Sequence, residues 1–99
     1  MTATPIEFHE AAAAEYEAAF AWYLERSEIA ATRFAQEVSR SLDLISAAPH
    51  RWPAHTHQTR RLVLRHFPFA IIYRKPSTVV QVVAMAHGHR RPGYWKDRL

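Results

Sequence analysis

The sequence has 99 residues, 48% of them apolar, which is enough for one small hydrophobic core and not for two. It contains no Cys, so disulfides and thiolate zinc sites are excluded, and it has no apolar run of the roughly 18 residues that a membrane helix needs. Its first residues include acidic ones where a signal peptide would be basic and then apolar. We therefore expect a soluble, cytoplasmic protein with one domain over residues 1–99.

The net charge of +4 conceals a division between the two halves of the chain. Residues 1–49 carry three Arg against eight Asp or Glu, a net charge of −5, whereas residues 50–99 carry ten Lys or Arg against Asp97 alone, a net charge of +9. Such asymmetry predicts a positive field on one side of the molecule, which would attract nucleic acid or an acidic protein segment. A solvated basic face without a partner is the alternative.

The first half of the chain predicts one short strand and two helices. Alternating polarity over residues 4–8 indicates the strand. Apolar side chains then recur at spacings of three and four over residues 10–26 and, after Ser27 as a suitable N-cap, over residues 29–48. Pro49 ends the second helix because it disfavours helical geometry in the residue before it. The short connection predicts an antiparallel helical hairpin.

Residues 49–59 show no periodicity and are predicted to form a surface loop. Within it, His55 and His57 have the spacing of a metal-binding pair. Zinc sites normally need three or four ligands, and no third ligand is evident in the sequence. The sequence therefore predicts no metal and no cofactor.

Three strands are predicted after this loop, over residues 61–65, 67–73 and 79–86. The turns between them are short, so neighbouring strands must be antiparallel. In the first of these strands, Arg61 and Arg65 alternate with aliphatic residues and therefore share one side. The fold class is α+β: a short N-terminal strand, then an antiparallel two-helix hairpin packed on one face of an antiparallel sheet, in the order β-α-α-β-β-β.

A series of motifs follows in order along nearly the whole chain: Glu15 to Trp22-Tyr23, Ala30 to Pro49, Arg61-Leu62, Phe67-Pro68-Phe69, Ile72-Tyr73, and Ala84 to His87 followed by Arg90-Arg91-Pro92-Gly93-Tyr94-Trp95. Each of these patterns has low specificity by itself. Together, in this order and spacing, they resemble the RelE/ParE superfamily of bacterial type II toxins, the toxic halves of toxin–antitoxin operons. The family fold is the α+β arrangement predicted above.

The resemblance implies a cognate antitoxin as partner, in a heterodimer or a higher hetero-oligomer, whose extended acidic and apolar segment wraps the toxin and blocks its basic surface. Operator DNA would be bound only through the antitoxin, and no membrane is involved. The resemblance also implies one of two targets. RelE-like members enter the ribosomal A site and cut mRNA, whereas ParE-like members bind DNA gyrase and poison it.

A metal-independent ribonuclease needs a base for the ribose 2′-OH, a cation for the developing phosphate charge and an acid for the leaving oxygen. If the chain is such an enzyme, the resemblance implies four residues for these roles: Arg61, His87, Arg90 and Tyr94. The alternative for His87 is an ordinary surface residue at the end of a strand.

One position departs from the ribonuclease pattern. Ala70 stands where well-characterised mRNA-cutting relatives carry an Arg beside the scissile phosphate. Loss of one charge-stabilising donor costs on the order of a hundredfold in rate. With the Phe67-Pro68-Phe69 turn and the Trp22-Tyr23 pair, this favours a ParE-like gyrase inhibitor. A degenerate, non-toxic member that only binds an antitoxin is the third alternative.

The residues predicted to contact a target or the antitoxin are basic or aromatic: Arg60, Arg65, Arg91, Trp95 and Trp22. Two of them have a structural alternative. Trp95 could fold back to cover the sheet, as aromatic residues near a chain end often do. Trp22 lies beside the apolar stripe of its helix, so it is either a core margin or a contact residue.

Overall fold

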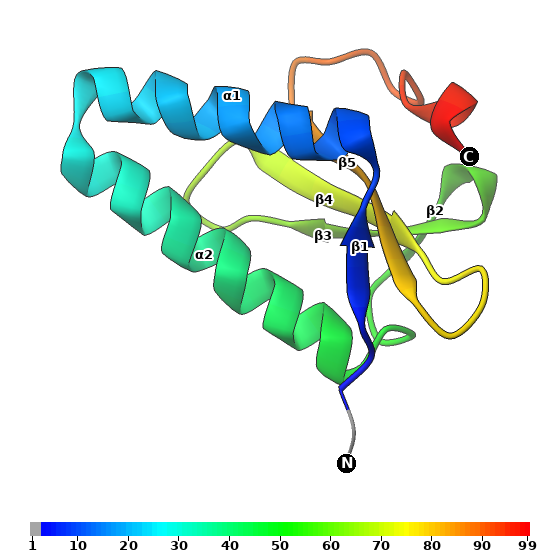
Figure 1. The fold of residues 1–99 in the computed structure, drawn as a ribbon. Coiled ribbons are helices and arrows are strands. Elements are labelled where there is room, and N and C mark those ends of the chain that lie inside the picture. Colours follow the sequence, from blue (N-terminus) through cyan, green and yellow to red (C-terminus); the bar gives the residue numbers. More distant parts are fainter. Residues whose placement is uncertain (1–2) are drawn as a thin grey trace.

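The two predicted helices are confirmed with nearly the predicted bounds. The computed structural model describes residues 3–99, in which α1 spans Glu10–Arg26 and α2 spans Glu28–Ala47. Ser27 ends one helix and begins the next, because its N–H donates to the Tyr23 carbonyl at 2.8 Å while its Oγ accepts an N–H of the first turn of α2 at 3.1 Å. This double cap folds the helices into the predicted hairpin (Figure 1).

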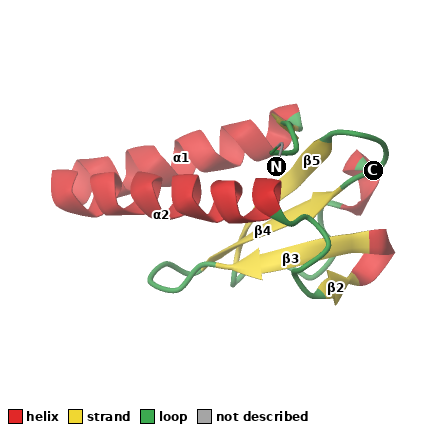
Figure 2. Cartoon of the chain, turned by 90° about the horizontal axis from the view of Figure 1, so that it is seen from below, coloured by secondary structure: helices red, strands yellow, loops and turns green. Residues whose placement is uncertain are grey.

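Within residues 3–99 the sheet has five strands, in the spatial order β1-β5-β4-β3-β2. Their bounds are Ile6–Phe8 for β1, Ala54–His55 for β2, Thr59–Val63 for β3, Phe69–Arg74 for β4 and Val80–His87 for β5. Figure 2 shows both helices on the same side of this sheet, as predicted. We call the opposite side the outer face.

The sheet differs from the predicted antiparallel one in two respects. First, β1 runs parallel to β5, with Ile6 opposite Val80, so the sheet is mixed. Short turns dictate direction only for consecutive strands, and the helices and three strands separate these two along the chain. Second, β2 lies inside residues 49–59, which were predicted to be loop, and pairs with β3. Two residues are too few to show an alternating pattern.

The main core lies between the helices and the sheet. At its centre Phe34 of α2 is 0% exposed, and its ring lies between 5.2 and 5.6 Å from the rings of Tyr16, Tyr23, Phe67 and Phe69. These aromatic side chains come from both helices, from the turn between β3 and β4 and from the first residue of β4. Aromatic pairs at such distances add to the free energy of burial, so this cluster sets how the hairpin sits on the sheet.

β5 contains a bulge at Val83. Tyr73 pairs with Val82 and Ile72 pairs with Ala84, so Val83 has no residue opposite it on β4. Tyr73 and Val82 belong to the core under the helices, whereas Ile72 and the two consecutive residues Val83 and Ala84 belong to a second apolar cluster on the outer face. Both sides of β5 are thus buried, which explains why its sequence is apolar at nearly every position.

Candidate functional site

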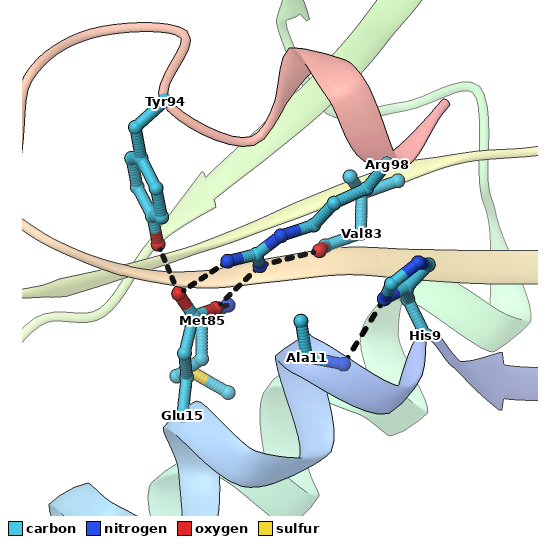
Figure 3. A network of polar contacts seen from close by, with 7 residues as sticks. All are labelled: His9, Ala11, Glu15, Val83, Met85, Tyr94 and Arg98. Atoms are coloured by element: carbon cyan, nitrogen blue, oxygen red, sulfur yellow. Dashed lines mark hydrogen bonds and ion pairs between the residues drawn. The ribbon is translucent and has the colours of Figure 1, made fainter.

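The segment after β5, which we call the tail, returns to the sheet edge and is held there by the Glu15 carboxylate of α1 (Figure 3). The Tyr94 hydroxyl donates to Glu15 Oε2 at 2.7 Å, and the Arg98 guanidinium donates to both carboxylate oxygens at 2.8 and 2.9 Å. The backbone N–H of Met85 donates to Oε1 at 3.0 Å. We call Glu15, Tyr94 and Arg98 the tail clamp, because they join α1, β5 and the tail.

The tail clamp closes the part of the β5 edge that β1 leaves open. β1 reaches only to Val82, so the backbone beyond it has no strand neighbour on that side. Unpaired backbone groups at a sheet edge invite pairing with another chain or cost free energy when buried. Here Glu15 accepts the Met85 N–H, and Arg98 donates to the Val83 carbonyl at 3.0 Å. Side chains thus replace the missing strand.

The clamp groups also shift one another's pKa values. Burial alone raises the pKa of Glu15, but hydrogen bonds from Arg98, Tyr94 and Met85 outweigh it and hold that pKa below its ordinary value of 4.5. The bond to Glu15 raises the pKa of Arg98. Burial, followed by the bond to Glu15, raises the pKa of the Tyr94 hydroxyl well above its usual range. Tyr94 is therefore a neutral phenol that donates a hydrogen bond to a charged carboxylate.

Trp95 fastens the tail to the outer face of the sheet. It is 2% exposed and packs in the second apolar cluster with Ile72 and Ala84, and its ring lies 6.0 Å from His55 and 5.7 Å from His57. Trp95 is predicted to contact a target or the antitoxin, and its burial agrees with the alternative, in which it folds back to cover the sheet. The outer face is not an open surface of Arg side chains at this point, because the tail covers it.

A groove of about 450 Å³ lies between α1, the start of β4, the end of β5 and the tail. We call it the tail groove. Its lining consists of Glu15, Ala18, Ala19, Trp22, Tyr23, Pro68, Phe69, Met85, His87, Arg90 and Tyr94. Most of these side chains are apolar, and the lining also includes the guanidinium of Arg90 and the imidazole of His87.

Two cation–π contacts shape this groove. The Arg26 guanidinium lies 3.7 Å from the Trp22 ring centre, and the Arg90 guanidinium lies 3.9 Å from that of Tyr94. Such contacts hold a cation over an aromatic face but do not neutralise its charge, as an ion pair would. Trp22 remains 52% exposed. This exposure argues against the core margin, and contact with a partner remains a prediction.

The four residues implied for ribonuclease chemistry do not all meet. His87, Arg90 and Tyr94 line the tail groove, and the His87 ring lies 5.0 Å from Phe69 and 5.1 Å from His89. Arg61 is exposed on β3 and lines a different groove, beside α2. The structure thus brings the tail residues together and leaves Arg61 apart from them.

Of the three basic residues predicted to contact a partner, one is held by a hydrogen bond within the chain and two are exposed. Arg60 donates to the Trp52 carbonyl at 2.7 Å and so holds the loop before β2 against the sheet. Arg65 and Arg91 are exposed, and neither makes a side-chain ion pair with a residue of the described chain. Arg65 and Arg91 remain available to an anionic partner.

No pattern in the sequence predicts a role for Glu15, although it stands in one of the motifs. Its partners Tyr94 and Arg98 are 79 and 83 residues away along the chain, so no local pattern connects them. The available signal was a single acidic side chain, preceded by four alanines, next to the apolar stripe of α1.

No group of three or more His, Cys, Asp or Glu within residues 3–99 is placed to hold a metal ion. His55 and His57 both lie beside Trp95 instead. None of the helices in the described part of the chain has the length and hydropathy of a membrane span.

The fold is one found in toxin–antitoxin systems. A chain from the solved structure of the chromosomal ParDE toxin–antitoxin system of P. aeruginosa matches it with a TM-score of 0.73 and 17% sequence identity, over 85% of this chain and 95% of that one. The family model of the ParE toxin of the type II toxin–antitoxin system parDE matches residues 6–92. The chain therefore belongs to the ParE toxin family. Comparison with curated proteins found no match.

Proposed function

We propose that the chain is the toxin of a type II toxin–antitoxin module, that a cognate antitoxin neutralises it, and that it acts by poisoning DNA gyrase without cutting nucleic acid. Membership of the ParE family supports the first part. The observation that carries the choice of gyrase over mRNA is the state of Tyr94, whose hydroxyl proton is donated to Glu15 at 2.7 Å. A phenol engaged in this way is poorly placed to transfer a proton to or from a ribose.

The outer face adds a second reason. Ala70 pairs with Val63 on one side and with Ala86 on the other, so three apolar side chains lie in a row across the sheet. No cation occupies this row, and a phosphate placed there would lack the donor that stabilises its developing charge. The geometry therefore favours a binding protein over an enzyme.

Contacts with the antitoxin are proposed for the tail groove and the exposed Trp22. The groove is mostly apolar and carries Arg90 at its rim, which suits a segment with both apolar and acidic side chains. Tryptophan is enriched at the residues that dominate binding energies. Trp22 lies at the C-terminal end of α1, where it is accessible without any change in the fold.

Expression of the Tyr94→Phe variant in a bacterial host tests the non-catalytic mechanism. Phe keeps the ring on which Arg90 stacks and removes one hydrogen bond, at a cost of about 1 kcal/mol in stability. We expect growth arrest to persist, with induction of a DNA-damage response and no codon-linked cuts when mRNA 5′ ends are mapped. Loss of toxicity in a folded variant, together with mRNA cuts by the unsubstituted protein, would support the ribonuclease instead.

A further inference from the structure

Two segments that are distant in the sequence meet around the Trp95 ring on the outer face (Figure 1). The chain from β2 to β3 carries His55 and His57, whose rings lie 6.0 and 5.7 Å from that of Trp95. The backbone of Gly93 in the tail, with a φ of 74°, lies beside His57, because a Cβ added to this glycine would be 3.8 Å from the His57 Nε2. The two segments therefore form one continuous surface.

Both segments carry cations on this surface. Arg61 of β3 lies on the outer side of its strand, because its partner in β4 belongs to the second apolar cluster. Burial, followed by the charge of Arg61, lowers the pKa of His55, as expected for neighbouring groups. In the tail, Arg91 and Lys96 line a cavity of about 430 Å³ together with His57. We call Arg61, Arg91 and Lys96, with the two imidazoles beside them, the basic stripe.

The three cations of the basic stripe are exposed, and none of them makes an ion pair within residues 3–99. One carboxylate, that of Asp97, lines the same cavity, and it is the one acidic side chain of residues 50–99. Burial of Trp95 and the tail clamp fix the backbone from which Arg91 and Lys96 project. The stripe is thus an ordered surface with more cations than the chain itself neutralises.

We propose that the basic stripe binds the phosphate backbone of duplex DNA without regard to base sequence. A duplex carries one phosphate charge about every 1.7 Å along its axis, so several phosphates meet the three cations at once and release their counterions. Contacts to phosphates position a protein but read no sequence. The inference does not rest on the proposed target, because the stripe needs no gyrase to meet DNA.

Two other anionic partners fit the stripe less well. Proteins that bind single-stranded nucleic acid stack its bases on aromatic side chains, and the indole of the stripe, Trp95, is only 2% exposed. An acidic polypeptide would meet the charges but no exposed large apolar side chain among the stripe residues, and exposed ion pairs alone contribute little. A duplex needs only the charges, which its phosphates supply at high density.

Fluorescence anisotropy of a labelled DNA duplex, mixed with the intact protein in the absence of gyrase, tests the proposal. We expect the Kd to weaken steeply as salt is added. The Arg61→Gln, Arg91→Gln, Lys96→Gln triple variant should bind at least about tenfold more weakly at low salt. It should also lower the slope of log K against log salt by about 2.7, because each lost phosphate contact removes about 0.9.

The matched control is the Arg26→Gln, Arg33→Gln, Arg40→Gln triple variant, which removes the same charge from exposed positions on the helices, across the sheet from the stripe (Figure 2). Its Kd should stay within about threefold of that of the unsubstituted protein, since only long-range attraction is reduced. Circular dichroism checks that both variants are folded.

NMR titration with the same duplex locates the contact on the unsubstituted protein. We expect the amide signals of residues 55–61 and 91–96 to shift and those of the helices to remain in place. The proposal would be overturned by equal weakening in the two triple variants, by the absence of salt-dependent binding, or by shifts confined to the tail groove. Tighter binding of a single-stranded oligonucleotide or of a poly-glutamate peptide than of the duplex would also overturn it.

Discussion

Replacing Glu15 with Ala should destabilise the protein by about 3 kcal/mol and release its tail. Removal of one member of a partly buried, hydrogen-bonded pair leaves the other charge without compensation. Here the substitution would remove the acceptor of three donors at once: the Arg98 guanidinium, the Tyr94 hydroxyl and the Met85 N–H. Urea unfolding measures the change in free energy, and hydrogen exchange at residues 94–98 reports release of the tail. Unchanged protection of the tail would contradict the clamp.

Glu17→Ala is the matched control for this substitution. Glu17 lies on the same helix, is exposed, and makes no ion pair or side-chain hydrogen bond with the described residues. Its loss should change the free energy of unfolding by less than about 0.5 kcal/mol.

The contribution of Glu15 should also depend on pH. Its pKa is lowered in the folded state, so its charged form stabilises the fold above the ordinary pKa of 4.5, and this contribution disappears as the pH falls through the lower, folded-state value. Glu15→Gln removes the titrating group. The difference in stability between the unsubstituted protein and this variant should therefore shrink on acidification. A difference that is constant from neutral to acidic pH would contradict the assignment.

Trp95→Ala should destabilise the protein slightly more, by about 4 kcal/mol, since truncating a buried aromatic residue leaves a large cavity. The side chain is 2% exposed and is the largest in the second apolar cluster. Urea unfolding compares it with Trp22→Ala, which removes an exposed ring and should cost less than about 1 kcal/mol. If Trp95 were a contact residue instead, its replacement would leave stability unchanged and weaken only the binding of a partner.

Much of the fold was predictable because its information is local. The apolar stripes of α1 and α2, the cap at Ser27 and the short turns between β3, β4 and β5 each depend on neighbouring residues. The parallel pairing of β1 with β5 depends on contacts between distant segments, and no pattern within either strand specifies its neighbour. The two-residue strand β2 exists only because β3 pairs with it.

The site was predictable in its composition but not in its arrangement. The clustering of Arg, His and aromatic residues after β5 correctly indicated the tail, and His87, Arg90 and Tyr94 do line one groove. The hydrogen bonding of Tyr94 depends on Glu15, which lies far away along the chain, in its acidic half. The charge difference between the halves predicts a positive field that attracts a partner. Part of that charge is instead neutralised within the chain, in the ion pair of Glu15 and Arg98.

Inhibition of purified gyrase is the most direct test of the proposed function. Relaxed plasmid, gyrase and ATP are incubated with the purified protein, and supercoiling and gyrase-linked DNA breaks are both measured. We predict loss of supercoiling and accumulation of covalent gyrase–DNA complexes, with no cleavage of DNA when gyrase is left out. Normal supercoiling at a large molar excess of a protein that arrests growth in cells would contradict the account.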